Sequence, residues 1–61
     1  MEPLLTTAEV AEIYRTSPET VRYWRHISYG PQGRKVGRRV LYEASEVERF
    51  WKQLTQADPQ P

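Results

Sequence analysis

The stretch of sequence that decides the fold is residues 6–26, TTAEVAEIYRTSPETVRYWRH. It opens with a capping-box pattern, in which Thr6 is the N-cap of a helix and Glu9, three residues later, reaches back to it. Apolar side chains then recur at the spacing of one helix face. This face, within a first helix predicted over residues 7–14, consists of Val10, Ala11, Ile13 and Tyr14.

A second helix start follows directly. Serine caps helices and proline is tolerated at the first helical position, so Ser17 and Pro18 predict a helix that runs to about His26. By their spacing of three residues, its inward side chains are Val21 and Trp24. Only two residues separate the first predicted helix from the second cap. Two short helices joined by so tight a turn form a helix-turn-helix.

The rest of the chain predicts a hairpin and a third helix. A loop over residues 28–33 contains two glycines and one proline. Gly37 and Arg38 follow, and glycine at the first central position favours a tight two-residue hairpin turn. A second capping box, at Ser45 and Glu48, predicts a third helix that ends near Thr55. Its apolar face consists of Val47, Phe50, Trp51 and Leu54.

The predicted fold is mainly α with a two-stranded β wing, a winged helix-turn-helix in the order helix, turn, helix, hairpin, helix. One domain covers residues 1–55, opening with a loose segment over residues 1–3, and a flexible tail covers residues 56–61. A two-stranded ribbon is not stable alone, so the wing must pack against the helices. A chain of 61 residues buries only about 60% of its unfolded surface, which predicts a small core.

Charge is strongly polarised along the chain. Residues 15–39 carry seven basic side chains and one acid, a net charge of +6. The two flanks together carry two basic side chains and seven acids, a net charge of −5. The basic middle is suited to a polyanion such as double-stranded DNA. The alternative is that the acids of the flanks fold back onto the bases as surface ion pairs.

Composition argues against several classes of function. The chain has no cysteine and a single histidine, His26, so we expect no metal and no cofactor. No Ser/His/Asp set, Walker loop or HExxH motif is present, and we expect no enzymatic activity. No apolar run approaches the roughly 20 residues that span a bilayer, and no signal-peptide core follows Met1. We therefore expect a cytoplasmic protein without a membrane partner.

The second helix is the candidate for DNA recognition, because the second helix of such a motif enters the major groove. Its solvent-facing side chains are Glu19, Arg22, Tyr23 and His26, with Thr20 at the margin. Arg22 can donate to guanine or phosphate, and Glu19 can accept from the cytosine amino group. Glu19 is equally well explained as a first-turn acid that interacts with the helix dipole. His26 is equally well explained as a surface side chain without a role.

The predicted wing is the second candidate for DNA contact. Arg38, at the hairpin tip, is suited to the minor groove or to a phosphate, while Lys35 and Arg39 point to either side of the ribbon. Further contacts with the DNA backbone are predicted for Arg15, Arg25 and Arg34. The alternative for the wing is a solvated loop. Both tryptophans lie on apolar helix faces, which favours packing in the core over stacking on bases.

Three segments resemble the MerR-type winged helix-turn-helix superfamily: TTAEVA (residues 6–11), SPETVRYW (residues 17–24) and, as the wing, VGRRVLY (residues 36–42). Within the superfamily the chain is similar to phage excisionases, the recombination directionality factors of tyrosine integrases. This resemblance implies that Glu19 and Tyr23 read bases and that Arg38 is the wing contact. Lambda-type excisionases carry arginine where this chain has Tyr23, so the base preference there must differ.

The excisionase resemblance implies a DNA-bending protein that binds tandem sites in phage attachment DNA and directs a tyrosine integrase toward excision. Copies would associate in a head-to-tail array along DNA in the cytoplasm of the host cell. Two alternatives remain. A small transcriptional repressor predicts a homodimer on a dyad-symmetric site. A protein-interaction module, such as an anti-repressor, predicts that the basic face meets an acidic protein.

Overall fold

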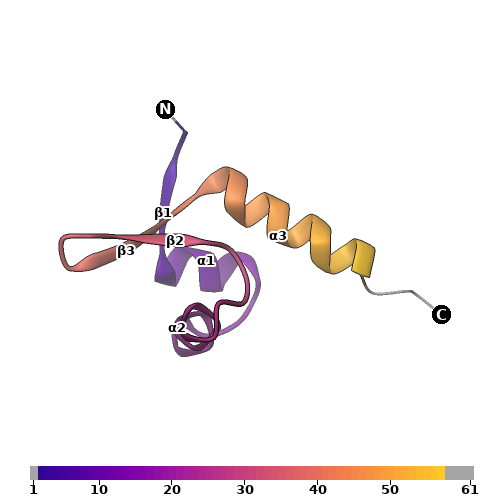
Figure 1. Ribbon diagram of the computed structural model, residues 1–61, viewed down its shortest axis with the longest axis horizontal. Coiled ribbons are helices and arrows are strands. Elements are labelled where there is room, and N and C mark those ends of the chain that lie inside the picture. The colour runs from indigo at the N-terminus through magenta and orange to yellow at the C-terminus, as the bar shows by residue number, and fades with distance from the viewer. Residues whose placement is uncertain (1, 58–61) are drawn as a thin grey trace.

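The structure is a computed structural model and describes residues 2–57. Its elements, in chain order, are β1 (Leu4–Thr6), α1 (Thr7–Ile13), α2 (Pro18–His26), β2 (Gly33–Val36), β3 (Arg39–Glu43) and α3 (Ala44–Ala57). Two short helices lie on one side of a small sheet, and α3 leads away from it (Figure 1). The three predicted helices and the hairpin are confirmed. Among residues 2–57, no helix combines the length and the apolar character of a membrane span.

Both short helices begin at the predicted caps. At α1, the Glu9 N–H donates to the Thr6 hydroxyl at 3.2 Å, and the Thr6 N–H donates to the Glu9 carboxylate at 2.8 Å, which completes the capping box. At α2, the Thr20 N–H donates to the Ser17 hydroxyl at 3.2 Å, and Pro18 stands at the first helical position. These local bonds satisfy backbone donors that a helix start otherwise leaves unpaired.

The two helices also end in the same type of turn. After α1, the Thr16 N–H donates to the Ala11 carbonyl at 2.8 Å and the Arg15 N–H donates to the Glu12 carbonyl at 3.1 Å. This pair of bonds defines the Schellman motif, in which the residue after the C-cap adopts a left-handed conformation. That residue is Arg15, with φ 60°. The predicted tight turn between the helices is therefore closed by backbone hydrogen bonds.

After α2 the motif repeats. The Tyr29 N–H donates to the Trp24 carbonyl at 2.7 Å, the Ser28 N–H donates to the Arg25 carbonyl at 3.2 Å, and Ser28 has φ 59°. The rings of Trp24 and Tyr29 meet edge to face with centroids 5.6 Å apart. This is the apolar contact that commonly accompanies the motif. It directs the chain from α2 into the loop that precedes the hairpin.

The sheet contains a strand that the sequence did not predict, because Leu4–Thr6 pairs with β3 as a third strand, β1. The strand order is β1-β3-β2, with both pairings antiparallel. Leu5 of β1 and Gly33 of β2 pair with Tyr42 of β3 from opposite sides. Three residues are too few to show an alternating pattern, so the sequence did not indicate β1. β3 thus forms hydrogen bonds with a strand on each side, and the additional strand stabilises the hairpin.

The predicted hairpin turn is confirmed. Gly37 and Arg38 connect β2 to β3, and Val36 pairs with Arg39 across the turn. Gly37 has φ 62°, whereas Arg38 does not have a positive φ. A positive φ at the first central residue alone is the pattern of a type II′ turn, whose twist matches that of the two strands. Arg38 therefore stands at the outermost point of the hairpin.

The predicted capping box of α3 is wrong, because the helix begins one residue before Ser45, at Ala44. The Glu2 carboxylate caps the helix instead, accepting from the Ser45 N–H at 2.8 Å and from the Ser45 hydroxyl at 2.9 Å. The Ala44 N–H donates to the Pro3 carbonyl at 3.1 Å. Hydrogen bonds from the Ser45 backbone, and then from its side chain, lower the pKa of Glu2 from its ordinary value of 4.5.

α3 also differs from the prediction at its far end. It continues to Ala57, so residues 56 and 57 are helical rather than part of a tail, and residues 58–61 lie outside the described residues. Val47 and Phe50 are buried as predicted, but Trp51 is 53% exposed. The Trp51 ring stacks on Tyr14 with centroids 6.4 Å apart. Trp51 therefore covers the edge of the core instead of filling it.

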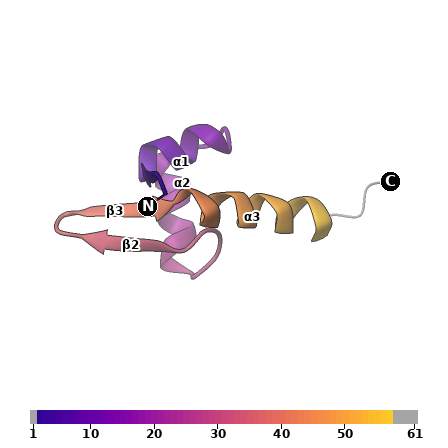
Figure 2. The same ribbon diagram turned by 90° about the horizontal axis from the view of Figure 1, so that it is seen from above.

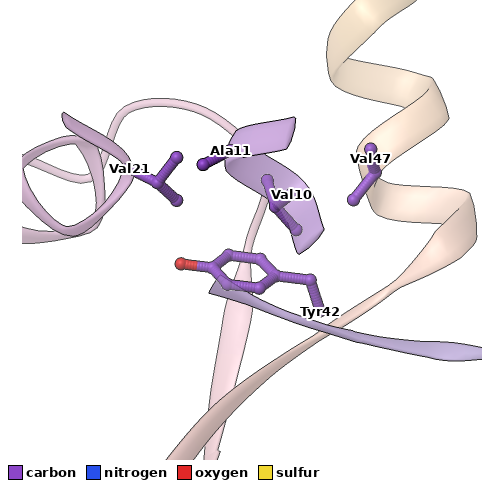
Figure 3. Packing of buried hydrophobic residues seen from close by; sticks show 5 residues of the cluster. All are labelled: Val10, Ala11, Val21, Tyr42 and Val47. Carbon is purple, nitrogen blue, oxygen red and sulfur yellow. The ribbon is translucent and has the colours of Figure 1, made fainter. Parts of the chain in front are cut away.

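A small core joins the sheet to the helices; Figure 3 shows its members, Val10, Ala11, Val21, Tyr42 and Val47. Ile13, which the sequence placed on the inward face of α1, is instead 52% exposed. At about 100° per residue, Ile13 lies roughly 110° from the centre of the face formed by Val10, Ala11 and Tyr14. A helix this short presents only that narrow face to the core.

The backbone at Gly33 lies so close to the Tyr42 ring that it fixes the position of this core side chain. A Cβ at this position would lie 2.7 Å from Cε2 of Tyr42 and 2.8 Å from Cγ1 of Val40. Neither distance is tolerated between carbon atoms, so only glycine fits here without displacing the Tyr42 ring. The ring is thereby held between the backbone of β2 and the buried face of the helix pair.

A cluster of aromatic rings attaches α3 to α1, α2 and the loop between α2 and β2. Phe50 lies 5.6 Å from Tyr14, 5.8 Å from Trp24 and 5.2 Å from Tyr29, measured between ring centroids. The Tyr14 hydroxyl donates to the Val47 carbonyl at 2.6 Å, and burial raises the pKa of Tyr14 to about 12. The predicted inward position of Trp24 is confirmed, since its half-buried ring joins this cluster.

Ser28→Gly should stabilise the protein, because glycine adopts the left-handed conformation at this position without a Cβ clash. The expected gain in the free energy of unfolding is about 0.5–1 kcal/mol, since the greater freedom of glycine in the unfolded chain offsets part of the relief. Urea denaturation followed by circular dichroism measures it. The control is Ser28→Ala, which keeps a Cβ and should bring no gain. If the two variants are equally stable, the left-handed conformation at Ser28 is not a source of strain.

Glu2→Gln should lower the free energy of unfolding near pH 7 and have little effect near pH 2. The folded chain lowers the pKa of Glu2, so its stabilisation is present above the unfolded pKa and is lost as the pH falls through the folded pKa. Urea denaturation at both pH values tests this. Glu12→Gln, on the exposed face of α1, is the control and should not destabilise the protein near pH 7. An equal loss for Glu2→Gln at both pH values would show that charge is not the cause.

Candidate nucleic-acid interface

A groove of about 490 Å³ lies between the start of α1, α2 and the β3 side of the hairpin. Its basic lining comes from two elements, with Arg22 and Arg25 on α2 and Arg38 and Arg39 at the hairpin. The remaining lining residues are Thr6, Thr7, Ala8, Val40 and Tyr42. The fold therefore brings four arginines, from the predicted recognition helix and the predicted wing, to the lining of one hollow. We call this hollow the arginine groove.

Local structure explains how these arginines meet. Arg22 and Arg25 are three residues apart on α2, so they lie on the same side of the helix. Burial of Val21 in the core orients α2 and leaves both arginines exposed. The hairpin tip projects past α1 and α2 (Figure 2). Arg38 and Arg39 of the hairpin therefore lie at the outer end of the domain, where a long polymer such as DNA can reach them.

No acidic side chain among residues 2–57 forms an ion pair with the arginine groove. Among residues 2–57, the ion pairs are Arg49–Glu46 at 3.4 Å and Lys52–Glu48 at 3.9 Å, both within α3. All four groove arginines are exposed, and within this part of the chain none of them pairs with an acid. For these arginines and the acids within residues 2–57, the alternative that the flanks fold back onto the basic middle is therefore wrong. A polyanion can approach them without first displacing an acid.

The exposed face of α2 is as predicted. Glu19, Arg22, Tyr23 and His26 are all exposed, and Tyr23 has 60% of its surface accessible. Thr20 is different: it is half-buried, and its hydroxyl lies 2.9 Å from the Ser17 hydroxyl, with which it shares a hydrogen bond. Thr20 thus belongs to the helix cap. Contacts of this face with DNA bases stay predictions, and so do both accounts of Glu19, which lies in the first turn.

The remaining predicted contact residues lie outside the arginine groove. His26 lines a second hollow, beside Arg25 and the loop before β2. Lys35 pairs with Val40 and lies on the face of the sheet that carries Tyr42, whereas Arg34 pairs with Leu41 on the opposite face. By the same alternation Lys35 and Arg39 lie on opposite faces, as predicted. Arg15 is exposed in the turn between α1 and α2.

Two parts of the groove were not predicted from the sequence. The start of α1 contributes Thr6, Thr7 and Ala8, which the sequence indicated only as a helix cap. Tyr42 contributes from β3, where the pattern indicated an apolar side chain of the hairpin. No local signal distinguishes these residues, because they reach the groove through the packing of α1 on the sheet. Within residues 2–57, no group of three His, Cys, Asp or Glu side chains could hold a metal ion.

A family comparison agrees with this geometry. A model described as a helix-turn-helix domain matches residues 4–55, which is most of the chain. The chain belongs to this helix-turn-helix domain family. The family includes excisionase-like DNA-binding proteins, and membership indicates DNA binding. No curated protein and no solved structure matches the chain.

Arg38→Ala should weaken binding to every DNA sequence, because Arg38 stands at the hairpin tip and lines the arginine groove. If the four groove arginines neutralise four phosphates, the slope of log affinity against log salt is about −4, and the variant should reduce it by about one. Fluorescence anisotropy with duplex DNA at several salt concentrations measures this.

Glu19→Ala is the matched variant on α2 and should mainly change sequence preference, since removing an acid does not remove a phosphate contact. The two variants are compared on a panel of duplexes. If both lower affinity by the same factor on every duplex, the division of roles between hairpin and α2 is wrong.

Proposed function

We propose that this helix-turn-helix protein is a DNA-bending excisionase of the MerR-like winged type, a binding protein and not an enzyme. It acts in the cytoplasm of the host cell, at tandem sites in phage attachment DNA. There it directs a tyrosine integrase toward excision. The observation that carries the DNA-binding part is the arginine groove, whose four arginines come from both α2 and the hairpin and pair with no acid among residues 2–57.

The proposed docking places α2 in the major groove and the hairpin tip at the neighbouring backbone or minor groove. Three exposed side chains of α2, Glu19, Arg22 and Tyr23, face outward and offer an acceptor, a donor and an aromatic ring to base edges. Arg38 is suited to a narrow minor groove, where the negative potential is enhanced. Contact at both grooves by so small a domain favours DNA that bends around it.

Control of an integrase requires more than one bound copy or a protein contact. A single small domain binds DNA with modest affinity. Neighbouring copies in a head-to-tail array would raise the affinity of each copy for DNA, and their individual bends would add to a larger one. α3 is the element most available to an integrase, because it leads away from the sheet and from the hairpin tip (Figures 1 and 2). Its half-exposed Trp51 offers an apolar surface of the kind that protein partners use.

A second candidate, the small transcriptional repressor, is favoured by the outer face of the sheet. A hollow there is lined by apolar Leu4, Val36 and Leu41, by basic Arg34, and by acidic Glu2 and Glu43. Val36 is 57% exposed. A two-fold contact between copies would set the basic side of one hollow against the acidic side of the other. Such a homodimer suits a dyad-symmetric operator rather than tandem repeats.

A nuclease footprint on candidate attachment-site DNA, titrated with protein, separates these functions. An excisionase should protect direct repeats in phase, with hypersensitive bands at bends, and the same protein should stimulate excision by the integrase in a purified assay. Protection of one inverted repeat at a promoter, together with a dimer in sedimentation, would identify a repressor. Absence of protection would refute both and point to an acidic protein partner for the basic face.

A further inference from the structure

One buried polar atom of the core has no partner. Tyr42 is 1% exposed, and its hydroxyl oxygen is buried without a hydrogen bond to any described residue. Buried side-chain hydroxyls are nearly always bonded, because an unsatisfied one keeps its full desolvation cost. The hydroxyl of half-buried Tyr14 shows the usual situation, since it donates to the Val47 carbonyl. A phenylalanine at position 42 would fill the same space without this cost.

The unpartnered hydroxyl belongs to the arginine groove. Tyr42 is the buried member of its lining, which also includes the exposed residues Arg22, Arg25, Arg38 and Arg39. In Figure 3 the Tyr42 ring extends beneath Val21, with its hydroxyl directed toward α2. The ring cannot withdraw, because it packs against the backbone at Gly33, where even a Cβ would clash. The fold therefore holds a fixed, buried hydroxyl on a residue that lines a basic hollow.

The chemistry of the lining restricts what can satisfy this hydroxyl. Guanidinium groups are donors only, so none of the four arginines can accept the tyrosine proton. The hydroxyl oxygen could accept from an arginine, but its hydrogen needs an acceptor, and the surrounding positive charge favours an anionic oxygen. A phosphate oxygen of the DNA backbone meets both requirements. It accepts from the hydroxyl and from the arginines at the same time.

We propose that the Tyr42 hydroxyl donates a hydrogen bond to one phosphate of the DNA backbone, seated in the arginine groove. This inference rests on the proposed DNA binding and names a residue that anchors it. The exposed arginines shift onto the entering phosphate and its neighbours, which gives the phosphate access to the hydroxyl. Tyr42 thereby fixes the position of the DNA strand relative to the core, whereas the flexible arginines supply attraction from a wider range of positions.

The test compares Tyr42→Phe with Tyr14→Phe, two variants that each remove one hydroxyl from a ring that packs in the interior, buried at Tyr42 and half-buried at Tyr14. Affinity is measured by fluorescence anisotropy with a labelled duplex of arbitrary sequence, and stability by urea denaturation. Tyr42→Phe should weaken DNA binding about tenfold, as expected for a hydrogen bond to a charged group, without loss of stability. Tyr14→Phe should show the opposite: lower stability, because the bond to Val47 is lost, and unchanged affinity while folded.

A second duplex, with methylphosphonate linkages that replace the charged backbone, identifies the contacted group. If the hydroxyl bonds to phosphate, the difference between wild type and Tyr42→Phe should largely disappear on this DNA. Tyr42→Phe that binds ordinary duplex as tightly as wild type overturns the inference, since the hydroxyl then holds only water. A defect confined to one base sequence also overturns it.

These outcomes are separate from those of the proposed function. A tenfold defect of Tyr42→Phe on arbitrary duplex, combined with a footprint on an inverted repeat, would keep this inference and refute the excisionase role. Protection of tandem repeats by wild type, with unchanged affinity of Tyr42→Phe, would keep the excisionase role and refute the inference. Failure of the wild type to bind any DNA would refute both.

Discussion

The packing of the Tyr42 ring against Gly33 and the helix pair is the contact on which the rest of the structure depends. β3 is the central strand, and Tyr42 is paired on both sides, with Leu5 of β1 and Gly33 of β2. Its ring lies in the same core as Val10 and Val21, one from each short helix. The contact therefore sets the distance and the angle between the hairpin and α2. Because the arginine groove lies between those two elements, the same contact determines the spacing of its charges.

A domain this small has little apolar surface to bury, and backbone hydrogen bonds at element ends make up part of the difference. α1 and α2 each begin at a side-chain cap and end in a Schellman motif, so few of their terminal groups remain unsatisfied. α3 obtains its cap from Glu2, which also holds the N-terminal segment against the sheet. These bonds fix short elements that isolated helices and hairpins could not maintain.

The unpaired basic surface has the opposite effect on stability. Four neighbouring guanidinium groups repel one another, and no acid among the described residues offsets them. Their exposure limits the repulsion, because water and salt screen charges at the surface. A bound polyanion would remove the repulsion and release its own counterions. Charge that weakens the folded state alone therefore strengthens the complex with DNA.

The sequence by itself determined the three helices, the caps of α1 and α2, the hairpin turn and the basic middle of the chain. Each of these depends on residues a few positions apart, which capping, periodicity and turn rules describe. Only the tertiary structure decided that β1 joins the sheet and that Glu2 caps α3 from 43 residues away. It also decided that Ile13 and Trp51 stay exposed, and that α2 and the hairpin bring their arginines to the groove that Tyr42 also lines. The physical reason is that strand pairing and side-chain packing act between segments distant in sequence, and no local pattern specifies which segments will meet.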